Sequence, residues 1–354
     1  MQDKSTGLIS KWIFVGIAML IVQVLLGGIT RLTGSGLSIT EWKPIMGILP
    51  PLNEGEWQQA FAKYQQIAQY KYINQHFTLS NFKFIFFWEW FHREWARLIG
   101  FVFLVPFIYF LVKSYFKSWM VAPLIILFLL GALQGAVGWI MVKSGLNDND
   151  VYVNHIRLAA HFMAAMLLIG YALVFGLMLI IRPQDRVVQP ALLKGAIVIG
   201  FMVCIQLIFG AFMAGLKAAS AAPTWPDING MILPQNLFSP GNSLYNISHN
   251  KIAVHFIHRT LAYLITLFIA IWRYNARKVT FSTVFTRAKN LTFLLVLIQI
   301  FLGVFTVING NNIVAGRFGT FERLAEMHQL TGMLLLLSLI ADIYILGKRQ
   351  TLVT

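Results

Sequence analysis

The chain has 354 residues, of which 58% are hydrophobic and only 12% are charged. Soluble domains carry about 25% charged residues. This composition, with a mean hydropathy of +0.69, therefore excludes a soluble globular protein and predicts one that crosses the membrane several times. The net charge of +15 does not indicate nucleic-acid binding, because the basic residues form short clusters between apolar runs, as membrane topology signals do. The single cysteine, Cys204, excludes an intrachain disulfide and a cysteine-based metal site.

Eight apolar runs follow one another along the chain, at residues 12–30, 84–112, 119–142, 157–181, 195–216, 252–272, 290–308 and 324–347. Lipid offers backbone groups no hydrogen-bond partner, so all eight are predicted to be helices. We interpret the first run as a retained helix rather than a signal peptide, because no small-residue cleavage site with a soluble domain follows it. The expected fold class is an all-α membrane protein with eight transmembrane helices.

The distribution of lysine and arginine predicts the orientation. If both termini are cytoplasmic, the inner segments hold 14 basic residues against two acidic ones. The outer segments also hold 14 basic residues, but with ten acidic residues and in much longer loops. The positive-inside rule, which applies to short loops, therefore places both termini in the cytoplasm. The long loops at residues 31–83 and 217–251 then face outward.

The second half of the chain repeats the first. Gln23–Gly27 (QVLLG) recurs as Gln206–Gly210 (QLIFG), 183 positions later, and His92-Arg93 recurs as His258-Arg259, 166 positions later. The four runs of the first half thus correspond to the four runs of the second, in the same orientation. The repeat predicts two pseudo-symmetric four-helix bundles, an N-terminal unit of residues 1–186 and a C-terminal unit of residues 187–354.

Within each unit, the odd-numbered and even-numbered runs carry different residue patterns. Odd runs carry Gln-x-x-x-Gly and even runs carry one histidine each, at His92, His161, His258 and His328. The Gln-x-x-x-Gly pairs are predicted packing devices, because glycine allows close approach and an amide can bond across helices. At about 1.5 Å per residue, all four histidines lie roughly 25–30 Å from the cytoplasmic charge belt, at one level near the outer face.

Four imidazoles at one depth could be zinc ligands, heme ligands, proton carriers, or buried side chains bonded to carbonyl groups. Zinc ligands usually cluster at short spacing or include cysteine and carboxylate, whereas two histidines that face each other across a helical bundle are typical of heme binding. Arginines at the outer ends of the even runs are candidate partners of heme propionates, with interfacial snorkelling as the alternative. They are Arg93, Arg97, Arg157, Arg259 and Arg323.

The two units differ beside their first histidine. Glu89 precedes His92 by three residues, and its counterpart at the offset of 166 is His255. A partly buried carboxylate at this place can serve as an acid or base, although a pair with Arg93 would also explain it. The remaining polar groups are weaker candidates: His76 and His249 are expected at the surface of outer loops, His155 near a loop, and Asp342 at a solvated helix end.

These residues together resemble the heme A synthase family, in its proteobacterial and mitochondrial branch. The resemblance rests on residues 27–38 (GGITRLTGSGLS), on Glu89-x-x-His92-Arg93, on Arg157–His161 (RLAAH), and on His258-Arg259 and His328-Gln329. It covers nearly the whole chain. Some members carry a cysteine pair in an outer loop, which this sequence does not have.

The resemblance implies an oxidoreductase of the bacterial cytoplasmic (inner) membrane that converts the C8 methyl group of heme O to a formyl group, giving heme A for cytochrome oxidase. It implies that His258 and His328 ligate a resident heme b, that His92 and His161 frame the iron of the substrate heme, and that Glu89 is catalytic. Heme O synthase, oxidase assembly factors and membrane lipid are the implied partners, nucleic acid is not, and the oligomeric state stays open. The alternatives are a b-type electron carrier without chemistry on heme and, from the internal repeat, a transporter.

Overall fold

The computed structural model describes residues 4–41, 47–235, 237, 243–313 and 318–347. Over these residues eight helices are long and apolar enough to cross a membrane. In chain order they are α1 (Lys4–Leu32), α4 (Leu79–Val112), α5 (Ser118–Lys143), α6 (His155–Ile180), α7 (Pro190–Gly215), α9 (Lys251–Asn275), α10 (Thr283–Ile308) and α11 (Thr320–Leu346). All eight predicted runs are therefore present, and the all-α membrane fold is confirmed.

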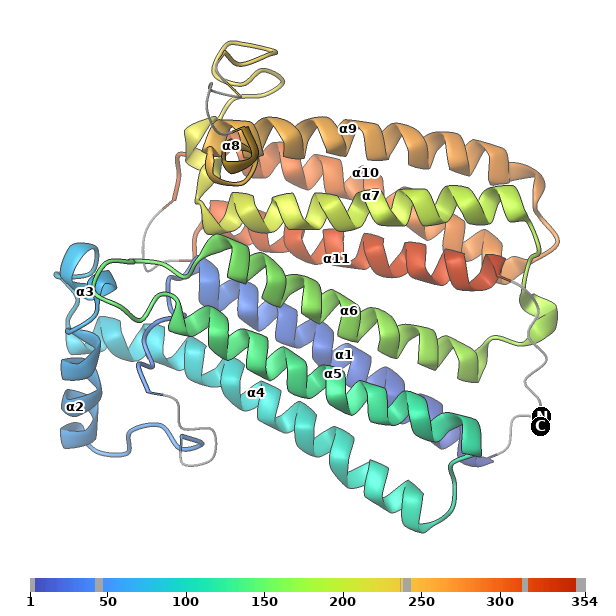
Figure 1. The fold of residues 1–354 in the computed structure, drawn as a ribbon, viewed down its shortest axis with the longest axis horizontal. Helices are drawn as coiled ribbons and strands as arrows, with labels where there is room; N and C mark the ends of the chain where they lie inside the picture. The colour runs from blue at the N-terminus through green and yellow to red at the C-terminus, as the bar shows by residue number, and fades with distance from the viewer. Residues whose placement is uncertain (1–3, 42–46, 236, 238–242, 314–317, 348–354) are drawn as a thin grey trace.

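The helices form two bundles side by side. Figure 1 shows α1, α4, α5 and α6 in one layer and α7, α9, α10 and α11 in the other. The layers meet where α6 packs on α7 and where α1 and α6 pack on α11. The division into units of residues 1–186 and 187–354 fits this arrangement and remains a proposal, since a packed interface joins the halves.

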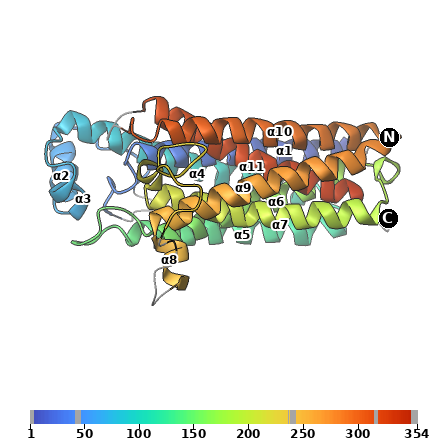
Figure 2. The same cartoon turned by 90° about the horizontal axis from the view of Figure 1, so that it is seen from above.

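The axes of the long helices are roughly aligned, and both ends of the described chain lie near the same end of the bundle (Figure 2). The turns between α4 and α5 and between α9 and α10 lie at this same end (Figure 1). Lys348 and Arg349, two of the 14 basic residues of the predicted inner segments, lie outside the described residues. Cytoplasmic termini therefore stay a prediction from the basic residues.

Each bundle consists of two packed helix pairs, in which an odd helix of the repeat lies against the even helix that follows it. The pairs are α1 with α4, α5 with α6, α7 with α9, and α10 with α11. Asparagine caps begin two of the histidine-bearing helices: Asn154 accepts hydrogen bonds from the first turn of α6, and Asn250 does so for α9.

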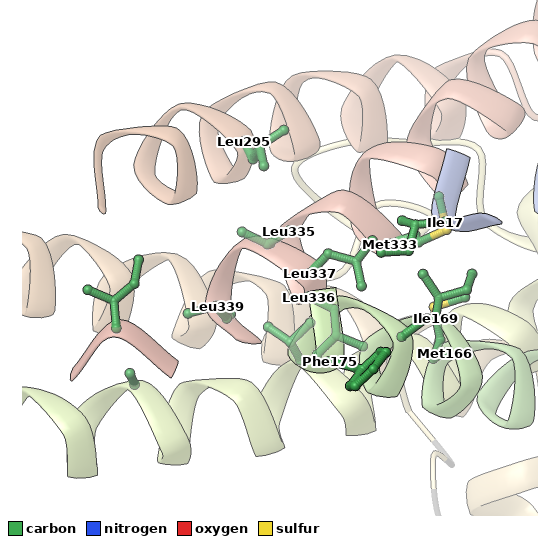
Figure 3. Close-up of a cluster of buried hydrophobic side chains, with 14 of the residues drawn as sticks. Ile17, Met166, Ile169, Phe175, Leu295, Met333, Leu335, Leu336, Leu337 and Leu339 are labelled. Atoms are coloured by element: carbon green, nitrogen blue, oxygen red, sulfur yellow. The ribbon is translucent and has the colours of Figure 1, made fainter. Parts of the chain in front are cut away.

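Buried apolar side chains fill the space between the layers. Ile17, Met166 and Ile169 of the first unit and Met333 of α11 lie close together there (Figure 3). Met333 is fully buried. Because this cluster joins both halves, the two units pack as one body rather than as separate domains.

A small polar subdomain extends α4 on the outer side. It contains α2 (Glu54–Tyr64) and α3 (Ala68–Tyr72), which cover the first turns of α4 (Figure 1). Tyr64 is fully buried in its apolar cluster, donates a hydrogen bond to Gln69 Oε1 at 3.0 Å and accepts one from Asn74 at 2.7 Å. Burial raises the pKa of the Tyr64 phenol to about 12. The corresponding loop of the second unit carries the 3-10 helix η2 (Ala218–Ala221) and the short helix α8 (Ser243–His249).

Candidate heme-binding and catalytic site

The four repeated histidines are held in one recurring way. In each pair of helices the glutamine of the odd helix reaches the histidine of the even helix. The side-chain amide of Gln23 donates to the backbone oxygen of His92 at 3.1 Å, and its nitrogen lies 3.3 Å from His92 Nε2. Gln206 makes the same contacts with His258. Gln134 donates to the backbone oxygen of His161 at 3.2 Å, and its nitrogen lies 3.3 Å from His161 Nδ1. The predicted hydrogen bond from a glutamine amide to the neighbouring helix is therefore confirmed.

The fourth pair is a variation on this arrangement. Gln299 Nε2 lies 3.4 Å from His328 Nε2, while His328 Nδ1 lies 3.1 Å from the backbone oxygen of Gln299. Glutamine and ring are thus in contact here too, although the backbone partner has moved from the histidine helix to the glutamine helix.

The glycine four residues after each glutamine makes room for the imidazole. A Cβ atom built on Gly138 would lie 2.8 Å from His161 Cε1, and one on Gly303 would lie 2.9 Å from His328 Cε1. At Gly27 and Gly210 the corresponding distances to His92 and His258 are 3.1 and 3.4 Å. Residues four apart lie on one face of a helix, so Gln-x-x-x-Gly holds a histidine by its backbone and accommodates its ring. We call this arrangement the histidine clasp.

The histidines also lie at a common depth. Each is 17–20 residues before the inner end of its helix, which corresponds to about 26–30 Å at 1.5 Å per residue. This agrees with the level expected from the sequence. Two imidazoles per bundle at one depth suit a single planar ligand in each bundle.

The second unit brings its two histidines face to face. The ring centres of His258 and His328 are 6.3 Å apart, and the ring planes meet at 80°. Two imidazoles that share a metal ion at metal–nitrogen distances of about 2 Å would hold their ring centres about 6 Å apart. Nδ1 of His258 is buried without a hydrogen-bond partner among the described residues. This pair therefore fits an iron atom held between two histidines.

The first unit has the same clasp around both of its histidines. His92 and His161 lie near enough to interact electrostatically, and Nδ1 of His92 is buried with no hydrogen-bond partner in the described chain. The side-chain oxygens of the four clasp glutamines are also buried and unpaired within the described residues. Unpaired buried polar atoms are costly, so their repetition at equivalent places is consistent with a ligand in each bundle.

Glu89 is buried and held at both carboxylate oxygens. Oε2 accepts hydrogen bonds from the Ser38 hydroxyl at 2.7 Å and from the Ile39 backbone at 2.8 Å. Oε1 accepts one from Arg93 at 2.6 Å. The pair with Arg93, which the sequence left open, is thus present, and the bonds from the segment after α1 are an addition that sequence reasoning missed.

The arginines at the outer helix ends differ in the partners they already have. Arg93 bonds Glu89, and Arg97 pairs with Glu94. Arg259 donates to the backbone oxygens of Asp227 and Ala222 at 2.7 and 2.8 Å, so its role in the described structure is to hold the outer loop.

Two further arginines lie nearer to solvent. Arg157 is exposed and lines an open depression of about 570 Å³ beside Lys143 and Asp150. Arg323 is also exposed, and its guanidinium reaches the Gly319 backbone oxygen at 3.3 Å. These two arginine side chains are therefore the most accessible of the five to a ligand that carries carboxylates.

His255 takes the place of Glu89 in the second unit, but it is not held in the same way. It is fully buried, and neither of its ring nitrogens has a hydrogen-bond partner among the described residues. No hydroxyl corresponding to that of Ser38 is available, because the residue 183 positions after Ser38 is Ala221. The second unit therefore has neither the carboxylate nor the hydroxyl that bonds it in the first.

Two expectations about other polar groups were wrong. Asp342 does not lie at a solvated helix end: it is fully buried and accepts a hydrogen bond of 2.6 Å from Thr292 of the neighbouring helix. His249 is half-buried instead of solvated, and its ring lies between Tyr245 and His155, with ring centres at 3.9 and 4.6 Å. His155 is the buried first residue of α6, while His76 is exposed as expected.

Comparison with known proteins agrees with this geometry. A family model described as COX15-CtaA, cytochrome oxidase assembly protein, matches residues 10–340. The chain belongs to this family. A heme A synthase of Parvibaculum lavamentivorans is 42% identical over 270 residues, which cover 76% of this chain and 78% of the relative. Heme A synthases of Brucella suis and Brucella ovis are 40% and 39% identical over 310 residues, covering 87% of this chain and 85% of each relative.

Two further buried acids, Glu322 and Glu326 of α11, were not predicted from the sequence. Glu326 of α11 is 3% exposed, and neither of its oxygens has a hydrogen-bond partner within the described residues. It packs against Gly28 of α1 so closely that a Cβ atom there would not fit, and Arg31 lies near it. The sequence does place Glu326 two residues before His328. In this segment the second unit (RLAEMH, residues 323–328) has one residue more than the first (RLAAH, residues 157–161).

Proposed function

We propose that this member of the family is a heme A synthase, an oxidoreductase that converts the C8 methyl group of heme O to a formyl group. The observation that carries the proposal is the doubled histidine clasp with an asymmetric acid. Both bundles hold two clasped histidines at one depth, but the first has the buried carboxylate of Glu89 where the second has His255. The curated relatives that match most of the chain carry the same name.

In the second unit, His258 and His328 would hold the iron of a resident heme b. Their ring separation of 6.3 Å supports this assignment. Bound there, heme b would supply one-electron redox chemistry. The protein's own contribution is to fix both rings through Gln206 and Gln299 and to surround them with apolar helices.

In the first unit, His92 and His161 would frame the iron of the substrate heme, with Glu89 as the catalytic residue. Glu89 precedes His92 by one helical turn, so its carboxylate lies on the same side of α4. A carboxylate there can stabilise positive charge that develops at the methyl carbon or accept a proton from an attacking water. Arg157 and Arg323 are proposed propionate partners, because they are exposed and lightly bonded.

The reaction sets a requirement for electrons. Conversion of a methyl group to a formyl group with water as the oxygen source releases four electrons and four protons. A one-electron acceptor must therefore take these electrons in successive steps. We place the protein in the bacterial inner membrane with cytoplasmic termini, where heme O synthase would supply the substrate and oxidase assembly factors would receive the product.

The test of this function is heme analysis in a bacterial host that makes heme O but no heme A. Expression of the chain should convert part of the extracted heme O to heme A, identified by its mass. A purified protein that holds heme b while the host heme O stays unchanged would contradict the proposal and favour the b-type electron carrier.

The role of Glu89 is tested in the same host. Glu89→Gln keeps the size of the side chain and removes the charge, so the variant should retain heme b and accumulate unconverted or partly oxidised heme O. Normal heme A production by Glu89→Gln would exclude Glu89 as the catalytic residue without affecting the assignment of the heme b ligands.

A further inference from the structure

The segment that follows α1 provides a preformed seat for the Glu89 carboxylate. Ser38 is 2% exposed, and its hydroxyl lies 2.7 Å from Glu89 Oε2 and 3.4 Å from the Ile85 backbone oxygen. A hydroxyl has one proton to donate, and the shorter contact to a carboxylate is the stronger bond. Ser38 therefore donates to Glu89.

The seat is rigid because the segment is bonded to itself and to its neighbours. The Ser35 backbone donates to the Thr30 oxygen at 2.8 Å, and the hydroxyls of Thr33 and Ser35 lie 2.6 Å apart. The turn passes through Gly34 at φ +70°, a conformation that favours glycine. Gln69 of α3 donates to the Gly34 backbone oxygen at 3.3 Å. The outer subdomain thus supports the segment that orients Glu89.

The second unit shows which part of this arrangement is scaffold. Arg93 donates to the Ile39 backbone oxygen at 3.4 Å, and Arg259 donates to the Ala222 backbone oxygen at 2.8 Å. Ile39 and Ala222 are 183 positions apart, the offset of the internal repeat. The bond from the arginine to the loop is therefore common to both units, and the aligned residues are equivalent in space as well as in sequence.

Beside this common bond the two loop segments differ in sequence, and the residue that precedes the histidine differs as well. Ser38 and Glu89 of the first unit correspond to Ala221 and His255 of the second. The hydroxyl is absent where the carboxylate is absent, although the arginine bond beside them is kept.

We propose that Ser38 is a positioning residue for the reaction at Glu89, an inference that rests on the proposed function. Ser38 and the Ile39 backbone hold Oε2, and Arg93 occupies one acceptor site of Oε1. The carboxylate has about four acceptor sites in all, so one on Oε1 is left to act on the substrate. Ser38 prevents rotation of the carboxylate and keeps that site in a fixed direction.

The experiment compares Ser38→Ala, Ser38→Thr and Ser35→Ala in purified, heme-loaded protein supplied with heme O and a soluble one-electron acceptor such as ferricyanide. Small misplacement of a reacting group costs up to about 100-fold in rate. Ser38→Ala should therefore lower kcat by about 10- to 100-fold, with KM and heme b content unchanged. Ser38→Thr restores the hydroxyl and should recover most of kcat. Ser35→Ala removes a hydroxyl of the same segment that bonds Thr33 and not Glu89, so it should lower kcat clearly less than Ser38→Ala does.

Three results separate the possibilities. Wild-type kcat in Ser38→Ala, while Glu89→Gln is inactive, would overturn the positioning role and leave the proposed function intact. Equal losses in Ser38→Ala and Ser35→Ala would also overturn it, because they would reveal general damage to the loop. Failure of the wild-type protein to convert heme O would instead refute the proposed function on which the inference rests.

Discussion

The histidine clasp makes a quantitative prediction at Gly138. Alanine at this position would place a Cβ atom 2.8 Å from His161 Cε1, closer than non-bonded carbon atoms approach. The ring must move away from α5 or the helices must separate. Overpacking of this kind typically costs about 1–3 kcal/mol. At 1.4 kcal/mol for each factor of ten, substrate heme should bind about 5- to 150-fold more weakly.

Gly135 on the same helix provides a matched control. A Cβ atom at Gly135 would meet nothing within 4 Å, and alanine stabilises a helix interior relative to glycine by about 1 kcal/mol. Titration of each purified variant with heme O, followed by absorbance, measures the affinity. Gly135→Ala should bind as wild type does while Gly138→Ala binds more weakly. Equal affinities in the two variants would refute the role of Gly138 in seating His161.

Three other changes test separate parts of the structure. Arg259→Ala removes the donors to the backbone oxygens of both Ala222 and Asp227, so it should increase proteolysis of the outer loop, and an unchanged cleavage rate would contradict the loop-holding role. Asp342→Leu leaves the buried Thr292 hydroxyl without this acceptor and should lower the free energy of unfolding by about 1–3 kcal/mol at unchanged heme content; loss of heme b would point to a functional role instead. Because the pKa of Tyr64 is raised to about 12, its contribution to stability is present below pH 10 and is lost as pH rises from 10 to 12. Thermal scans across this range should show a steeper loss for wild type than for Tyr64→Phe.

The eight helices could be predicted from the sequence because apolar runs in lipid have only one way to satisfy their backbone groups. The internal repeat identified His92, His161, His258 and His328 as candidate site residues. Glu89 was identified because the repeat has His255 at the equivalent position. That repeat also predicted a bond from glutamine across helices, which the structure contains. It did not indicate that the partner was the histidine itself, because periodicity shows which face a residue occupies but not what lies opposite.

The remaining features depend on contacts between distant parts of the chain. Ser38 and Glu89 are 51 positions apart and meet only after α4 returns beside α1. Asp342 looked solvated because it lies six residues before Lys348, yet Thr292 of α10 covers it. Glu326 is buried by α1, a helix almost 300 residues earlier. Such contacts follow from the packing of the two halves, which no local pattern specifies.

The division of labour between the bundles is the central claim, and heme analysis of two histidine variants tests it most directly. His258→Ala and His92→Ala are purified from a host that makes heme O, and the bound and extracted hemes are identified by absorbance and mass. His258→Ala should lose resident heme b. His92→Ala should keep heme b and lose only the conversion of heme O to heme A. Loss of heme b from His92→Ala with its retention in His258→Ala would contradict the assignment of the two units.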